Sequence, residues 1–436
     1  MTTRSARRLW RIASGKGTSK MTMLPKMQML RLATAGSVDD GKSTLIGRLL
    51  YDSKAIFDDQ LSAVEAASAA SNDDYTNLAL LTDGLRAERE QGITIDVAYR
   101  YFSTPARKFI IADTPGHLQY TRNMVTGAST ADVAVILVDA RKGVLEQSRR
   151  HAYLCSLLRV PHMVLCVNKM DLVDWSADVF TVISTEFRTF AESLDLSSLT
   201  TVPVSALNGD NIVAGSGNAP WYTGEPLLPY LESTAFAGPD ACAAGRLPIQ
   251  HVIRHDTGVR YAGQIASGEL RPGQQVTVLP SGAQSCIAAI HTADGPRDFA
   301  RAPLSVAIEL SDDIELHRGD MICTGPDSPS VTQDIDATIC WMDENAALTT
   351  ESEYTIKHTT RTGTATVTDL VHRIDVNDLG ATTAADELTL NEIGRVRLHT
   401  SIPLVCDSYR DNRATGGFIL IENESNRTVA GGIITC

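Results

Sequence analysis

The sequence lacks several patterns that would assign the chain to a class at once. Its eight cysteines contain no Cys-x-x-Cys pair, so nothing in the spacing supports a structural zinc site. No apolar stretch approaches the length of a membrane span, and the N-terminal region has no apolar core of the secretory type. These absences favour a cytoplasmic chain whose cysteines stay reduced.

Acidic residues are absent from the first thirty positions, which carry seven Lys or Arg residues. Residues 1–29 are therefore expected to form a basic, disordered tail, or to lie upstream of a true start at Met21, Met23 or Met27. An organellar presequence and a basic binding arm are the alternatives. The whole chain has a formal net charge of −13, which argues weakly against a protein that coats nucleic acid.

The length of 436 residues suits about three domains. In the first half, short apolar or β-branched runs alternate with stretches of helical spacing. This alternation is typical of an α/β domain, in which helices cover both faces of a mostly parallel sheet. The predicted strands are Met29–Ala35, Phe109–Ala112, Val133–Val138, Met163–Val167 and Val202–Val204, and the first predicted helix is Ser43–Tyr51.

The pattern changes after Leu231. Ser233–Gly245 is rich in Ala, Gly and Pro and is expected to be a linker, and from Leu247 onward short alternating runs are separated by turn signals. This pattern predicts two small antiparallel β-barrels with a break near Gly325–Asp334. The expected domains are an α/β P-loop GTPase domain at 30–236 and β-barrels at 245–330 and 335–436.

A phosphate-binding motif follows the first predicted strand directly. Such a loop wraps its backbone N–H groups around the β-phosphate of a nucleotide, and the next helix adds a favourable N-terminal field. Lys42 is expected to bridge the β- and γ-phosphates, and the Ser43 hydroxyl is expected to ligate Mg²⁺. No second motif of this kind follows residue 43. The predicted phosphate-contacting residues are Gly36, Ser37, Val38, Asp39, Asp40, Gly41, Lys42, Ser43 and Thr44.

The run Asp113-Thr114-Pro115-Gly116-His117 follows another predicted strand. Asp113 would reach Mg²⁺ through water, and Gly116 would offer its N–H to the γ-phosphate. A histidine after a glycine is usually an ordinary surface or core residue, but in this motif His117 is expected to hold the attacking water. Thr94, within Gly92–Asp96, is the candidate switch residue, with a hydroxyl for Mg²⁺ and an N–H for the γ-phosphate. The candidate catalytic residues are Lys42, Thr94 and His117, and the candidate metal ligands are Ser43, Thr94 and Asp113.

A guanine-specific motif is formed by Asn168, Lys169 and Asp171. The Asp171 carboxylate can accept two hydrogen bonds from guanine, and adenine lacks that donor pair. Lys169 can lay its aliphatic stem over the base. The run Ser205-Ala206-Leu207 completes the set, because the Ala206 backbone can mark the guanine O6. The predicted cofactors are therefore GTP or GDP and Mg²⁺.

The order of these motifs, the Asp-x-Pro-Gly-His form and the two trailing barrels resemble the translation-factor class of GTPases, typified by elongation factor Tu. Ser37 and Asp40 stand where elongation factors usually carry histidine. A closer resemblance is to the GTPase subunits of bacterial ATP sulfurylase, the sulfate adenylyltransferase subunit 1 family. The runs that carry it are Glu88–Phe102, Gln119–Ser129, Lys357–Arg361, Leu390–Val396 and Arg410–Ile419.

The resemblance implies a partner and a reaction. A small catalytic subunit would bind ATP and sulfate and form adenosine 5′-phosphosulfate and pyrophosphate, and GTP hydrolysis on this chain would drive that unfavourable step. Neither nucleic acid nor a membrane is an expected partner. The main alternative is an elongation factor-like GTPase that delivers aminoacyl-tRNA, and a nodulation-type sulfation protein with the same chemistry is a minor one.

Overall fold

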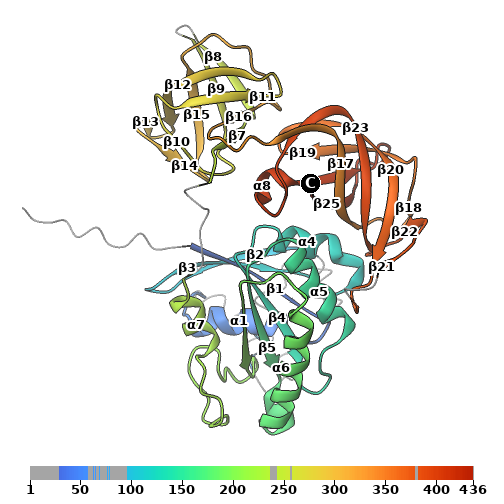
Figure 1. Cartoon of the computed structure of the whole chain (residues 1–436). Coiled ribbons are helices and arrows are strands. Elements are labelled where there is room, and N and C mark those ends of the chain that lie inside the picture. The colour runs from blue at the N-terminus through green and yellow to red at the C-terminus, as the bar shows by residue number, and fades with distance from the viewer. Residues whose placement is uncertain are drawn as a thin grey trace, which may run out of the picture.

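The computed structural model describes residues 29–56, 96–235, 243–255, 258–378 and 382–435, with the single positions 62, 64, 68, 76 and 78. A first domain of helices and sheet lies below two β domains (Figure 1). Of the predicted basic tail, 1–29, only Met29 is described, and it begins β1 rather than ending a tail. The segment Gly92–Ile95, which includes Thr94, lies outside the described residues. Within the described part of the chain, no helix is long and apolar enough to cross a membrane.

The first domain is built on a six-stranded sheet in the order β2-β3-β1-β4-β5-β6. All neighbours are parallel except β2, which runs antiparallel to β3 at the edge. β4 is buried along its whole length, as expected for a central strand of a sheet that is covered on both faces. The strands are β1 (Met29–Gly36), β2 (Ala98–Ser103), β3 (Lys108–Asp113), β4 (Val133–Asp139), β5 (His162–Asn168) and β6 (Ser198–Pro203).

Helices cover both faces of this sheet, so the predicted α/β architecture is confirmed. One core contains Leu45 and Leu49 of α1 with Leu227 of α7. The other contains Leu154 of α5 and Phe187 of α6. The helices are α1 (Lys42–Asp52), η2 (Leu118–Tyr120), α4 (Thr121–Ala128), α5 (Glu146–Leu157), η3 (Met170–Val173), α6 (Ala177–Ala191) and α7 (Leu227–Ser233).

Strand β6 starts earlier than its hydrophobic pattern indicates. The apolar run predicts a strand at Val202–Val204, whereas β6 extends over Ser198–Pro203. Its first three residues, Ser198, Leu199 and Thr200, are only partly buried, and they pair with the first residues of β5. Backbone pairing at the edge of a sheet therefore continues where the hydrophobic signal has stopped.

The second domain is an antiparallel sheet in the order β7-β16-β11-β12-β15-β9-β8, with β13 paired to β12. Strand β11 alternates buried and partly exposed residues, as expected for a sheet with one face on a core. Its strands are β7 (Arg246–Pro248), β8 (His251–His255), β9 (Gly258–Gln264), β10 (Glu269–Leu270), β11 (Gln275–Leu279), β12 (Ala283–Thr292), β13 (Gly295–Arg297), β14 (Ala300–Arg301), β15 (Ser305–Leu310) and β16 (Met321–Cys323).

The third domain is a closed barrel, because β19 pairs with both β24 and β20 and so closes a ring in the order β19-β24-β25-β17-β23-β20, with β21 paired to β20 outside the ring. Trp341, Ile356 and Leu398 belong to its core. β17 begins at Ser330, inside the predicted break at Gly325–Asp334. The exact limits of the domains stay a prediction. The strands are β17 (Ser330–Trp341), β18 (Leu348–Thr349), β19 (Glu353–His358), β20 (Arg361–Ile374), β21 (Thr382–Thr383), β22 (Glu387–Leu388), β23 (Ile393–Cys406), β24 (Gly417–Ile421) and β25 (Thr428–Ile434).

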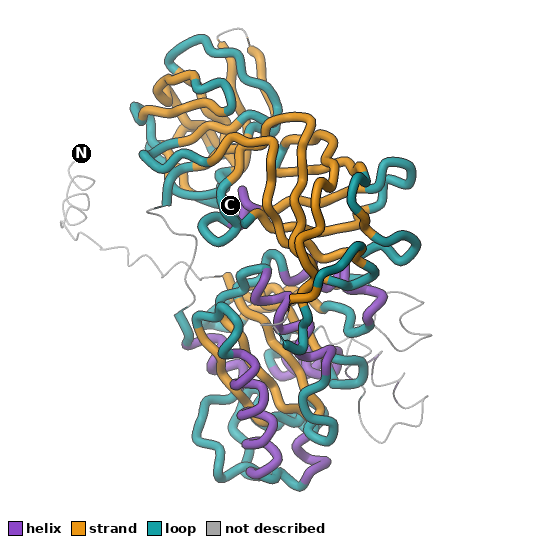
Figure 2. The backbone as a smooth tube through the Cα atoms, turned by 45° about the vertical axis from the view of Figure 1, so that its right-hand side comes forward, coloured by secondary structure: helices purple, strands orange, loops and turns teal. Residues whose placement is uncertain are grey.

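The loop Asp407–Gly416, which ends in the short helix α8 (Arg413–Gly416), joins the three domains. Figure 2 shows the helices gathered in the first domain, with this one short helix among the strands of the upper part. Arg413 donates to the carbonyl of Ser129 at 2.6 Å, and the Tyr409 hydroxyl donates to the carbonyl of Leu158 at 3.2 Å. These two bonds attach the third domain to the ends of α4 and α5.

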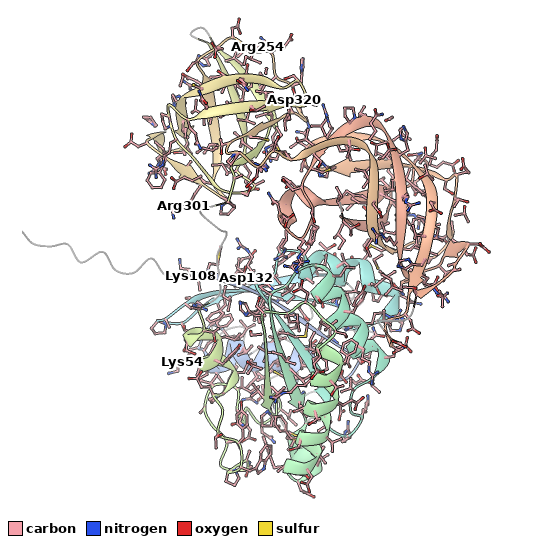
Figure 3. All side chains as sticks on the ribbon, in the orientation of Figure 1. Lys54, Lys108, Asp132, Arg254, Arg301 and Asp320 are labelled. Carbon is pink, nitrogen blue, oxygen red and sulfur yellow. The ribbon has the colours of Figure 1, made fainter. Side chains whose placement is uncertain are left out.

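The same loop also binds the second domain. The Asp407 carboxylate accepts two hydrogen bonds of 3.2 Å from the guanidinium of Arg246, and a third of 2.6 Å from the Thr415 hydroxyl. A second polar contact joins Arg361 of the third domain to Asp320, at 3.4 Å, and Figure 3 shows Asp320 on the side of the second domain that faces the third. The two β domains are thus held together by paired charges.

We expect Asp407→Ala to lower the free energy of unfolding of the two β domains by about 2–4 kcal/mol, because it leaves the guanidinium of Arg246 without its carboxylate. The side chain of Arg246 is only 4% exposed, so its guanidinium has little contact with water and depends on its protein partners. Urea denaturation followed by circular dichroism measures the loss.

The matched control is Asp369→Ala, which removes the carboxylate of the surface pair with Arg397. Both side chains of that pair are about half exposed, so the expected loss is about 1 kcal/mol or less. Equal losses for the two variants would show that the Asp407 contact does not stabilise the junction.

Candidate nucleotide-binding site

The candidate site lies where the carboxyl ends of the parallel strands meet. The register pairs Gly36 of β1 with Leu137 of β4, and Asp139 of β4 with Asn168 of β5. In doubly wound sheets, ligands bind at this edge because the loops that follow the strands converge there. The predicted motif residues at the ends of β1, β3 and β5 are therefore brought together.

The phosphate loop between β1 and α1 requires glycine at its end. Gly41 has φ of 95° and precedes the first residue of α1, so it occupies the left-handed region that favours glycine. A Cβ at this position would lie 2.4 Å from the side-chain nitrogen of Asn168. The backbone turn and this close approach both exclude a larger side chain.

Lys42 is the buried cation of the loop. Its ammonium donates to the carbonyl of Gly36 at 3.0 Å and to that of Ser37 at 2.8 Å. Burial lowers the pKa of Lys42, and the carboxylates of Asp113 and Asp40 oppose that shift. The Lys42 ammonium can therefore exchange its two carbonyl partners for phosphate oxygens without passing through bulk water.

Asp40, predicted only as a phosphate-loop residue, has a clear structural role. Its carboxylate accepts a hydrogen bond of 2.7 Å from the backbone N–H of Ser37. Burial raises the pKa of Asp40, while this hydrogen bond and the charge of Lys42 lower it. The Asp40 side chain therefore bonds back to the start of the phosphate loop and holds its backbone turn in place.

Asn168 joins the phosphate loop to the predicted base-binding loop. Its amide nitrogen donates to the carbonyl of Asp40 at 2.7 Å, and its amide oxygen accepts from the N–H of Ala206 at 2.9 Å. The side chain is buried, so both bonds form away from water. Three loops that are distant in sequence are fixed by one amide.

Lys169 and Asp139 form an ion pair of 3.0 Å beside this amide. Although burial opposes ionisation of Asp139, hydrogen bonds from Arg141 and Lys169 hold its pKa well below the ordinary range. Asp171 lies two residues further on, in η3, and is partly exposed. Neither Asp139 nor Arg141 was predicted, although an acidic residue that ends a fully apolar strand next to a phosphate loop was an available signal.

Of the three predicted Mg²⁺ ligands, the structure describes Asp113 and Ser43, whereas Thr94 lies outside the described residues. Asp113 is buried at the end of β3 and interacts electrostatically with Lys42, and Ser43 is the second residue of α1. A hydroxyl and a carboxylate are hard oxygen donors that suit Mg²⁺, which usually takes its remaining ligands from phosphate and water. No cluster of three His, Cys, Asp or Glu residues that could hold a metal by itself occurs in the described part of the chain.

His117 lies just before η2, and its described contacts are with its own segment. Its Nδ1 accepts a long hydrogen bond of 3.4 Å from the N–H of Gln119, and its ring centroid is 6.0 Å from that of Tyr120. Gly116 is packed against the phosphate loop, since a Cβ there would lie 2.3 Å from the Lys42 nitrogen. The motif therefore contacts the loop through Gly116, and the role of His117 stays a prediction.

Comparison with known proteins identifies related chains. Residues 27–253 match the family model of the elongation factor Tu GTP binding domain, and residues 334–435 match the GTP-eEF1A C-terminal domain-like model. The chain is 56% identical to the bifunctional enzyme CysN/CysC of Mycobacterium tuberculosis (strain ATCC 25618 / H37Rv), over 93% of this chain and 67% of that protein. It is 51% identical to sulfate adenylyltransferase subunit 1 of Chromobacterium violaceum, over 93% of this chain and 86% of that protein.

Among solved structures, that of sup35 complexed with GMPPNP covers 94% of this chain and 94% of its own, with 22% identity and a TM-score of 0.42.

We expect Gly41→Ala to weaken GDP binding by about 10- to 100-fold, because strain in the left-handed region and the contact with Asn168 would distort the phosphate loop. Fluorescence titration with a labelled GDP measures the change. The control is Gly215→Ala, whose Cβ would meet nothing within 4 Å. Unchanged affinity in Gly41→Ala would mean that this loop does not hold the nucleotide.

Proposed function

This chain belongs to the sulfate adenylyltransferase subunit 1 family, and from that premise we propose that it is the GTP-hydrolysing subunit of a sulfate adenylyltransferase. The observation that carries the proposal is the 51% identity to a subunit 1 protein over 93% of this chain. The junction of Asn168 with the phosphate and base-binding loops supports the GTP-binding part independently, because its two hydrogen bonds join residues from three of the predicted motifs.

The phosphates of GTP would be held by the loop Gly36–Thr44 and by the N-terminus of α1. Lys42 would move from its two carbonyl partners to the β- and γ-phosphate oxygens. Ser43 and Asp113 would hold Mg²⁺, together with Thr94, and the ion would neutralise phosphate charge. Asp171 would accept the two guanine donors, with Lys169 along the base and Ser205–Leu207 at its O6.

His117 would orient the water that attacks the γ-phosphate. Support comes from its place in the chain, directly after Gly116, which packs against the phosphate loop. Such a role changes the hydrolysis rate more than the affinity for GTP, because it concerns the attacking water.

The proposed partner is a small catalytic subunit that binds ATP and sulfate and releases adenosine 5′-phosphosulfate and pyrophosphate. The sequence has one phosphate-binding motif, and that motif leads into the site described above. A second nucleotide would therefore bind elsewhere. We also propose that the complex works in the cytoplasm, without nucleic acid or membrane as a partner.

An elongation factor-like role is the alternative, and the match to the elongation factor Tu GTP binding domain favours it at the level of architecture. The phosphate loop argues against this alternative. Asp40 stands where elongation factors usually carry histidine, and its carboxylate accepts a hydrogen bond from the N–H of Ser37 within the loop.

The deciding experiment measures phosphate release and adenosine 5′-phosphosulfate formation with each subunit alone and with both. We expect this chain alone to hydrolyse GTP at about 10⁻⁴ s⁻¹, since isolated switch GTPases lack complete stabilisation of the transition state. It should form no adenosine 5′-phosphosulfate by itself, and the small subunit should accelerate GTP turnover. Sulfate activation by this chain alone, or a partner without effect on turnover, would refute the proposal.

Base specificity gives a second prediction. Asp171→Asn should weaken GTP binding by about 100-fold or more and favour xanthosine triphosphate, because the amide matches the altered base edge. Asp174→Asn is the control, since Asp174 is exposed and already in the left-handed region that asparagine tolerates. Competition against labelled GDP measures the nucleotide affinities of both variants. Equal affinity of the wild type for ATP and GTP would refute the assignment of Asp171 as the guanine-binding residue.

A further inference from the structure

Arg48 is a partly buried arginine on α1 that the proposed chemistry does not use. Its side chain is 17% exposed, and its guanidinium donates to two backbone carbonyls of the loop that follows β6. Nε bonds the carbonyl oxygen of Ala206 at 3.3 Å, and Nη2 bonds that of Leu207. Both residues belong to the loop Ser205–Leu207, which is proposed to lie at the guanine O6.

The helix that carries Arg48 begins at the phosphate loop. Lys42 is the first residue of α1, and Arg48 follows on the same helix. Because a helix is held rigid by its own backbone hydrogen bonds, the two carbonyls are fixed relative to the phosphate loop. Asn168 joins the same two loops through separate bonds, to the carbonyl of Asp40 and from the N–H of Ala206. The base-binding loop is therefore attached to the phosphate loop by two side chains.

The guanidinium of Arg48 is itself held in place. Asp52, one turn later on α1, pairs with its Nη1 at 3.6 Å. Gly209 packs against this pair, since a Cβ there would lie 3.4 Å from Cδ of Arg48 and 3.4 Å from a carboxylate oxygen of Asp52. A guanidinium is planar and presents its donors in a fixed fork. Two carbonyls and one carboxylate, each on a different nitrogen, therefore fix its orientation.

The peptide between Ala206 and Leu207 carries both the carbonyl that Nε of Arg48 holds and the N–H of Leu207. This peptide is trans, so the two groups share one plane and point in opposite directions. Fixing the carbonyl toward Arg48 therefore fixes the direction of the N–H.

The N–H of Leu207 is the donor of this loop that is left for a ligand. The N–H of Ala206 already donates to the amide oxygen of Asn168. The N–H of Leu207 has no acceptor among the residues that the structure describes. Leu207 is also 38% exposed, so a ligand can reach it.

We propose that Arg48 is a positioning residue for base recognition, which aims the N–H of Leu207 at the O6 of guanine. The inference rests on the proposed GTP-binding function, and it assigns the O6 contact to Leu207 instead of Ala206. Guanine has a carbonyl oxygen at position 6, whereas adenine has an amino group there. A fixed N–H therefore matches guanine and opposes adenine. Arg48 adds a determinant of base choice that is independent of Asp171.

The test uses two analogues of GDP that each change one edge of the base. In 6-thio-GDP, sulfur replaces O6 and is a weaker acceptor, while both donors for Asp171 remain. Inosine diphosphate lacks the exocyclic amine and keeps O6. The ratio of each analogue's dissociation constant to that of GDP reports one contact, because a general loss of binding cancels in the ratio.

We expect the wild type to bind 6-thio-GDP about 10-fold more weakly than GDP. In Arg48→Met, which has no donor, GDP should bind about 3- to 10-fold more weakly, and the penalty for 6-thio-GDP should shrink to about 2-fold. The penalty for inosine diphosphate should not change, because Asp171 is untouched. Arg48→Lys keeps a charge beside Asp52 but lacks the fork for two carbonyls, so its penalty for 6-thio-GDP should be intermediate. This milder variant decides the question if Arg48→Met does not fold.

Arg107→Met is the matched control. Arg107 is a buried arginine of the same domain that donates to the carbonyls of Leu231 at 2.8 Å and Thr234 at 3.0 Å. Its loss should leave both ratios unchanged. A wild-type penalty for 6-thio-GDP in the Arg48 variants, or an equal change in Arg107→Met, would overturn the inference. A wild type that binds neither GDP nor GTP would instead overturn the proposed function.

Discussion

The amide of Asn168 is the interaction on which the candidate site depends. Its nitrogen and oxygen each make a buried hydrogen bond, one to the loop that would hold phosphate and one to the loop that would hold the base. An amide is suited to this position because it donates and accepts at the same time. The parallel strand order makes the contact available, since β5 ends beside β4 and β1 at one edge of the sheet. Losing either bond would leave a buried polar group unpaired and free one loop from the others.

The same edge of the sheet is linked to the third domain through α5, which the loop Asp407–Gly416 contacts. α5 supports the phosphate loop through His151, and its last turn receives the hydroxyl of Tyr409 from the third domain. The core on this face continues across the boundary, because Cys340 and Ile393 of the third domain pack into it. A shift of α5 would therefore be felt both at the phosphate loop and in the barrel.

Local pattern predicted much of this molecule. The apolar runs before Gly36, Asp113 and Asn168 identified three parallel strands, and the motifs at their ends indicated the candidate site, because a phosphate loop needs its residues in one short stretch. The hydrophobic pattern predicted strand ends less well where backbone hydrogen bonds to a neighbouring strand, rather than buried side chains, stabilise the strand. β6 extends into polar residues that periodicity passes over, and β17 starts before the expected boundary, since both gain hydrogen bonds from a neighbouring strand.

The sequence by itself determined the elements that depend on neighbouring residues: the glycine turn at Gly41, the order of the motifs and the alternation of strand and helix. Only the tertiary structure decided the contacts between distant segments. Asp139 meets Lys169, Gln147 reaches Gly116, and Asp407 meets Arg246 across 161 positions. Such pairs have no spacing rule, because a glutamine or an aspartate is common on any surface. What gives each its role is the partner that the folded backbone places within hydrogen-bond distance, and that distance is set by the packing of whole domains.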